Sequence, residues 1–87
     1  MRQNQRDEQF QLAGHAVEVT FLAKQLLAAK KSGDQIDSRM VNFCISRIES
    51  TLFRISFHNL IEDFDGDEYT RSYILNLDKI LEDVKNI

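Results

Sequence analysis

Asp63, Asp65 and Asp67 alternate along one short acidic segment that Glu68 extends. Calcium-binding EF-hand loops carry acidic residues at positions 1, 3 and 5, Gly at position 6 and a bidentate Glu at position 12. Counted from Asp63, position 6 is Glu68 and position 12 is Ile74, so the sharp turn and the bidentate ligand are both missing. We therefore expect no metal site here. Asp65 and Glu68 instead have the spacing of a capping box, which predicts a helix N-terminus.

Three further side chains could act as ligands or reactive groups, but none has the partners that catalysis or metal binding needs. His58 and Glu62 share a helical face without a second His or a Cys nearby, so His58 is interpreted as a surface residue. His15 is expected to be half-buried and hydrogen-bonded, with a pH-responsive switch as the alternative. Cys44 falls on an apolar stripe and is interpreted as an inert core thiol. As the one cysteine of the chain, it excludes an intramolecular disulfide.

No phosphate-binding glycine loop, nucleophile elbow or HExxH motif occurs in the sequence. We therefore expect a protein that is not an enzyme and that needs no cofactor. A DNA-binding transcriptional regulator remains an alternative, because a set of basic residues could form one strip: Lys24, Lys30, Lys31, Arg39, Arg47 and Arg54. Against it, residues 1–61 hold eight Lys and Arg and six Asp and Glu, a net charge of only +2.

The composition predicts how these residues are positioned. The 87 residues include no Pro and three Gly, which favours long helices over a many-stranded sheet. Apolar residues recur at spacings of four and three in three stretches, which predict helices over about 5–31, from 34–38 to about 62, and from about 67 to the end. The expected fold is all-α: a three-helix bundle with two long helices and a shorter peripheral third, in a single domain of residues 1–87 with residues 1–5 disordered.

Two local features leave alternatives open. Residues 53–57 alternate between apolar and polar, so a short strand competes with helix there. Gly14 lies within the first predicted helix and either marks a close helix crossing or is simply tolerated.

The two long helices each carry a second set of apolar residues, opposite the main stripe on a helical projection. A three-helix bundle covers one stripe per helix, so we expect the second sets to be an association surface, and a homodimer to form through it. The expected interface residues are Phe10, Val17, Phe21, Phe43, Phe53, Phe57, Leu60 and Ile61. The alternative is a kink near Ser56 that returns Phe57, Leu60 and Ile61 to the core.

Charge is unevenly distributed along the chain, with an overall net charge of −3. Residues 62–87 hold three Lys and Arg against eight Asp and Glu, a net charge of −5. Acidic surfaces favour basic partners, so Asp78, Glu82 and Asp83 are candidate partner-binding residues. A solvated acidic face that maintains solubility is the simpler interpretation.

The first 11 residues are almost all polar, and no stretch approaches the ~20 apolar residues of a membrane span. We therefore expect a cytoplasmic protein without membrane contact. The expected function is that of a small regulator, adaptor or inhibitor that binds another protein. A phage or mobile-element inhibitor of a host system is a further alternative that no residue of the sequence demonstrates.

Overall fold

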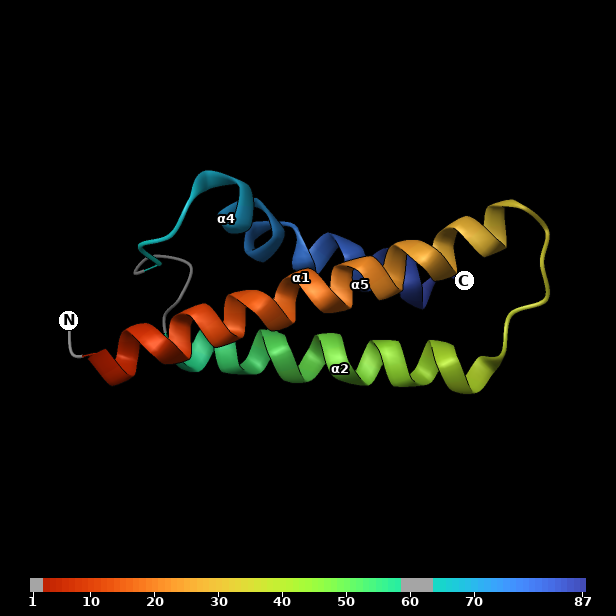
Figure 1. Cartoon of the computed structure of the whole chain (residues 1–87). Helices are drawn as coiled ribbons and strands as arrows, with labels where there is room; N and C mark the ends of the chain where they lie inside the picture. The colour runs from red at the N-terminus through yellow and green to blue at the C-terminus, as the bar shows by residue number, and fades with distance from the viewer. Residues whose placement is uncertain (1–2, 59–63) are drawn as a thin grey trace.

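The computed structural model describes residues 3–58 and 64–87 and is all-helical over these residues. Helices α1 (Gln3–Lys31) and α2 (Ser38–Phe57) form a long antiparallel pair. Helices α4 (Glu68–Leu75) and α5 (Leu77–Lys85) follow, with α4 packed on α1 and α5 in contact with both α1 and α2 (Figure 1). The result is an elongated molecule of 47 × 21 × 16 Å.

Local chemistry explains the turn between α1 and α2. Gly33 has a φ of +79°, as expected of a glycine just after a helix C-terminus. The Asp34 N–H donates to the Ala29 carbonyl at 3.0 Å and the Gly33 N–H to the Lys30 carbonyl at 3.1 Å, the hydrogen-bond pair of a Schellman motif. Asp37 then caps α2, because its Oδ1 accepts the Arg39 N–H at 2.8 Å.

The predicted third helix is in fact two helices, so the prediction of three was wrong in number. Asn76 separates α4 from α5 with a φ of −94° and a ψ of 2°. Asn is a weak helix former whose side chain competes for backbone hydrogen bonds, which suits it to such a junction. The predicted capping residue was also wrong: Asp67, and not Asp65, caps α4, with its Oδ2 accepting the Thr70 N–H at 3.2 Å.

Several boundaries also differ from the expected ones. Residues 3–5, expected to be disordered, belong to α1. Residues 53–57 are helical and form the end of α2, so the strand alternative is wrong. Helix α2 ends at Phe57, before the expected boundary near residue 62, and His58 is its C-cap.

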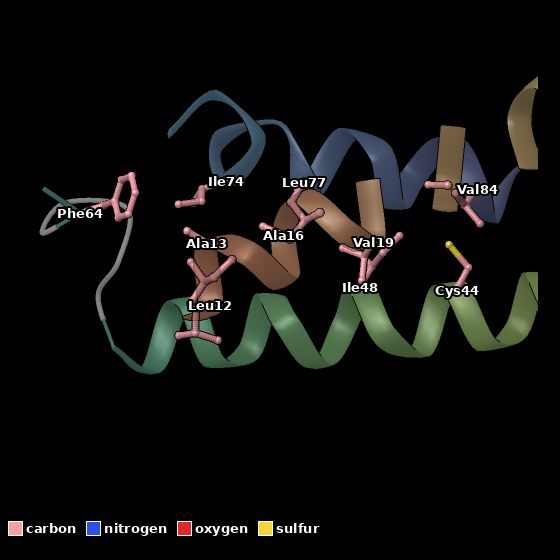
Figure 2. Close-up of a cluster of buried hydrophobic side chains, with 12 residues drawn as sticks. Leu12, Ala13, Ala16, Val19, Cys44, Ile48, Phe64, Ile74, Leu77 and Val84 are labelled. Atoms are coloured by element: carbon pink, nitrogen blue, oxygen red, sulfur yellow. The ribbon is translucent and has the colours of Figure 1, made fainter. Parts of the chain in front are cut away.

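The core lies along the seam where the helices meet (Figure 2). From α1 and α2 it takes residues of the predicted main stripes, among them Leu12, Val19, Cys44 and Ile48, all at most 2% exposed. Helices α4 and α5 add Ile74, Leu77 and Val84. The buried Thr20 and Thr51 hydroxyls donate to the carbonyls four residues earlier, at 2.7 and 2.8 Å, which satisfies both polar groups.

Phe64 is the core member outside the helices. Its side chain is 6% exposed, and its ring lies edge-on to the Phe10 ring at a centroid distance of 6.0 Å. A Cβ atom at Gly66 would collide with the Phe64 ring, so glycine leaves the space that the ring occupies. Gly14 is different: no atom of the described residues lies within 4 Å of the place where its Cβ would stand, so Gly14 marks no close helix crossing among them.

Candidate protein-binding face

The outer side of α2 carries three exposed phenylalanines, Phe43, Phe53 and Phe57, which we call the α2 aromatic face. Their exposed fractions are 53%, 72% and 75%. The buried residues Cys44, Ile48, Thr51 and Ile55 occupy the opposite side of the helix. Figure 1 shows no described segment against the side of α2 that is turned away from α1.

Two neighbours modify this face without covering it. The Arg47 guanidinium carbon lies 5.9 Å from the centroid of the Phe43 ring, within the range of a cation–π interaction. The Phe57 ring stands edge-on to His58 at 5.1 Å. Because Phe57 is exposed at the end of α2, a kink does not return this residue to the core. Leu60 and Ile61, expected on the same surface, lie outside the described residues.

The second apolar set of α1 has a different environment. Phe10 and Phe21 are 46% and 49% exposed, and Val17 is partly buried. The Phe10 ring packs on Phe64, and the Phe21 ring lies 5.9 Å from the Tyr73 ring of α4. Segment 64–75 therefore covers part of the surface of α1 that was expected to be an interface. That these residues also contact a second protein stays a prediction.

The acidic residues of α5 do not form one continuous patch. Asp78 and Glu82 are exposed one helical turn apart, whereas Asp83 is partly buried. Asp83 lines a groove between α1 and the α4–α5 pair, together with Lys24 and Lys79. Both lysines line the same groove as Asp83, and the role of the three acids in binding a basic partner stays a prediction.

The same groove holds two tyrosines whose hydroxyl oxygens are 2.7 Å apart, Tyr69 and Tyr73. The hydrogen bond to Tyr69 raises the pKa of the Tyr73 phenol, and desolvation adds to the shift. Lys24 Nζ lies 5.7 Å from the centroid of the Tyr73 ring. The phenol pair therefore lies in the groove that Lys24, Ser72 and Asp83 also line.

The residues considered for chemistry lie apart from one another. Cys44 is fully buried, and burial raises the pKa of its thiol, which disfavours the reactive thiolate. His58 Nδ1 lies 3.6 Å from Glu8 Oε2, and His15 is partly buried in α1. Among the described residues, no three His, Cys, Asp or Glu side chains gather to hold a metal ion. Glu62 and Asp63, two members of the sequence-based candidate sites, lie outside those residues.

Within the described residues, no helix has both the length and the apolar character to cross a membrane. No protein-family model, curated protein or solved structure matches this chain. Its function must therefore be inferred from its own surface.

The sequence pattern predicted the second apolar sets, but it did not predict which of them other segments of the chain cover. The periodicity of α1 places Phe10 and Phe21 outward whatever lies over them. Phe64 follows no helical period, because it lies in a turn, and the position of Tyr73 over Phe21 depends on the path of the chain after α2. A glycine two residues after Phe64, Gly66, was the one sequence feature that could have indicated a turn with the Phe64 ring packed against it.

Proposed function

We propose that this chain acts by binding protein and not by catalysis, as a small regulator, adaptor or inhibitor, and that the α2 aromatic face is its association surface. The observation that carries the proposal is the exposure of Phe53 and Phe57, at 72% and 75%, on the same helix side as Phe43. Exposed apolar patches of several large side chains are uncommon on monomers and mark sites of interaction. Aromatic residues in particular are enriched at the centres of protein interfaces.

Two features separate this face from an unfinished core. The core beneath α2 is complete without it, since Ile48 and Ile55 are at most 1% exposed. The face also alternates its rings with polar residues, Ser46, Arg47 and Ser50, which keep a solvent-exposed helix soluble. Both features are typical of a surface that exists free in solution before it associates.

The test compares the natural chain with the double variant Phe53→Ser, Phe57→Ser. Association is measured as the concentration dependence of the sedimentation coefficient, and as quantitative capture of proteins from the source cell. We expect the double variant to keep its helical circular dichroism and to lose self-association or the captured partner. The matched control is Leu75→Ser, which removes an apolar side chain that is 52% exposed on α4.

Association that is the same in the natural chain, the double variant and the control would contradict the proposal. DNA binding gives a different result again: affinity for duplex DNA falls steeply as salt rises, because bound counterions are released. A salt-dependent complex with DNA that survives in the double variant would replace protein binding with the DNA-binding alternative.

A further inference from the structure

The four central positions of the outward side of α2 have the same residue types when the helix is followed in either direction. Six exposed positions follow one another at spacings of 4, 3, 4, 3 and 4, the seam spacing of a coiled coil: Arg39, Phe43, Ser46, Ser50, Phe53 and Phe57. Ile48 lies at their midpoint, on the buried side. Phe43 and Phe53 lie five residues from it in either direction, and Ser46 and Ser50 lie two residues from it.

We propose that the α2 aromatic face binds the same face of a second copy of this chain, with the two α2 helices antiparallel and the twofold axis at the level of Ile48. This rests on the proposed function, because it names the occupant of the proposed association surface. A twofold interface brings one patch against itself, so residue types must be complementary under that rotation. In this register Phe43 lies against Phe53 of the second copy, and Ser46 against Ser50 of the second copy.

The chemistry of the ends selects the antiparallel arrangement. It places the Arg39 guanidinium against the Phe57 ring of the second copy, a cation–π pair. The Arg39 side chain is 90% exposed, and its Nη2 atom lies 3.3 Å from the carboxylate of Asp37, two residues earlier, so among the described residues it has room to turn toward a ring. A parallel pairing would instead bring Arg39 against Arg39 of the second copy, which is repulsive.

The middle of the face suits a close crossing of two helices. Ser46 and Ser50 have small side chains one turn apart, between Phe43 on one side and Phe53 on the other. Their hydroxyls can donate to partners across the interface or to water, so burial leaves no unsatisfied group. The Phe43 and Phe53 rings of both copies then close the interface on either side of the serines.

The area available predicts a dimer of moderate affinity. With about 200 Å² for each phenylalanine, the exposed fractions of the six rings in two copies add up to roughly 800 Å². The side chains of Ser46 and Ser50 and the aliphatic part of Arg39 raise the buried area toward the lower limit of stable interfaces, about 1,200 Å². We therefore expect micromolar dissociation and not a permanent dimer.

The charged flanks distinguish a second copy from an acidic partner. Arg47 and Glu49 lie on opposite flanks of the face, and the twofold axis brings each next to its own counterpart in the second copy. Salt screens such like-charge pairs, so self-association should stay constant or strengthen as salt rises. A helix of acidic sequence bound to Arg39, Arg47 and Arg54 would weaken instead.

The first test is sedimentation equilibrium of the whole chain, of Phe53→Ala and of the control Leu75→Ala, at low and high salt. We expect the natural chain to reach twice its 10.2 kDa mass. Phe53→Ala removes a ring from each copy and should raise the dimer dissociation constant at least about tenfold. Leu75→Ala should leave the constant unchanged.

The second test reports the register by disulfide formation between chains with Ser46→Cys or Ser50→Cys. In the antiparallel register, Ser46 of one copy faces Ser50 of the other, whereas the two Ser46 positions are offset by about 6 Å along the helix axes. A mixture of the two variants should therefore cross-link faster than either variant alone, as a 46–50 linkage identified by mass spectrometry. The natural Cys44 is buried and gives the background rate.

Each contrary outcome overturns the inference. A monomer at every concentration, a dimer that Phe53→Ala leaves intact, or dominant 46–46 linkages would each do so. A monomer that still captures another protein through Phe53 and Phe57 refutes the second copy as occupant and leaves the proposed function standing. If substitutions of Phe53 and Phe57 change neither self-association nor capture, both this inference and the proposed function are refuted.

Discussion

The two long helices each carry outward phenylalanines, but only α1 has them in contact with aromatic rings from another segment of the described chain. Phe10 and Phe21 of α1 meet Phe64 and Tyr73, and about half of each side chain remains exposed. On α2, Phe53 and Phe57 are 72% and 75% exposed, and the Phe57 ring contacts its chain neighbour His58.

The difference shows that the same sequence pattern has two structural meanings. A second apolar set on a helix indicates a second neighbour, and the neighbour can belong to the same chain or to another one. For α1 the neighbour is the segment that runs from Phe64 into α4. α2 packs on α1 and α5 through its inward side, and no other described segment lies over the α2 aromatic face, which is why this face carries the proposed function.

The largest expected effect separates the two sides of α2. Ile48→Ala removes a fully buried side chain and should lower the free energy of unfolding by about 4 kcal/mol. Phe57→Ala removes an exposed ring and should change it by less than about 0.5 kcal/mol when measured at concentrations below dimerisation. Urea denaturation followed by circular dichroism measures both. Equal losses would mean that Phe57 belongs to the core.

The next effect tests the cover over α1. Phe64→Ala removes a ring that is 6% exposed and should cost about 3 kcal/mol. It should also increase the exposure of Phe10, which packs on this ring, and so increase the binding of a hydrophobic dye. Phe53→Ala is the matched control with little expected effect on stability. A Phe64 variant as stable as this control would show that segment 64–75 contributes no cover.

Sequence periodicity was sufficient to predict that the chain is helical and which residues of α1 and α2 face the core. Leu12, Ala16, Val19 and Ile48 fall on the predicted stripes and are at most 2% exposed. It could not show which outward set is covered, because the contact between Phe21 and Tyr73 depends on chain path and not on helical period. It also missed the junction at Asn76, since Tyr73, Leu77, Ile80 and Val84 keep helical spacing across it.

Two glycine variants give smaller and opposite effects. Gly66→Ala places a methyl group where the Phe64 ring lies, so the ring must move, at a cost of about 1–2 kcal/mol. Gly14→Ala adds a methyl group with nothing within 4 Å in the interior of α1, and should stabilise the chain by about 0.5–1 kcal/mol. Thermal denaturation of both variants measures the signs. Destabilisation by Gly14→Ala would show that this position packs against a neighbour in solution, such as a second copy of the chain.

The smallest effect concerns the N-terminus of α4, which carries Tyr73 over Phe21. Hydrogen bonds from Thr70, from its side chain and from its backbone N–H, lower the pKa of Asp67 below the ordinary range of aspartate. Because the pKa is lower in the folded state, the stabilisation is complete above the ordinary pKa and is lost as pH falls through the lowered one. The first turn of α4 should therefore loosen only under acidic conditions, with a loss of the Phe21–Tyr73 contact.

Nuclear magnetic resonance measures this loosening as the pH dependence of the Thr70 amide shift. The midpoint should lie below the ordinary range of aspartate. Asp67→Asn keeps a hydrogen-bond acceptor without the titrating charge, so the Thr70 shift should then be insensitive to pH over this range while α4 still forms. Resonances of Phe53 and Phe57 should not respond in either protein, because α4 does not cover the α2 aromatic face. A common response of both faces would show that acid unfolds the whole chain at once, and that the cover over α1 is not an independently loosening element.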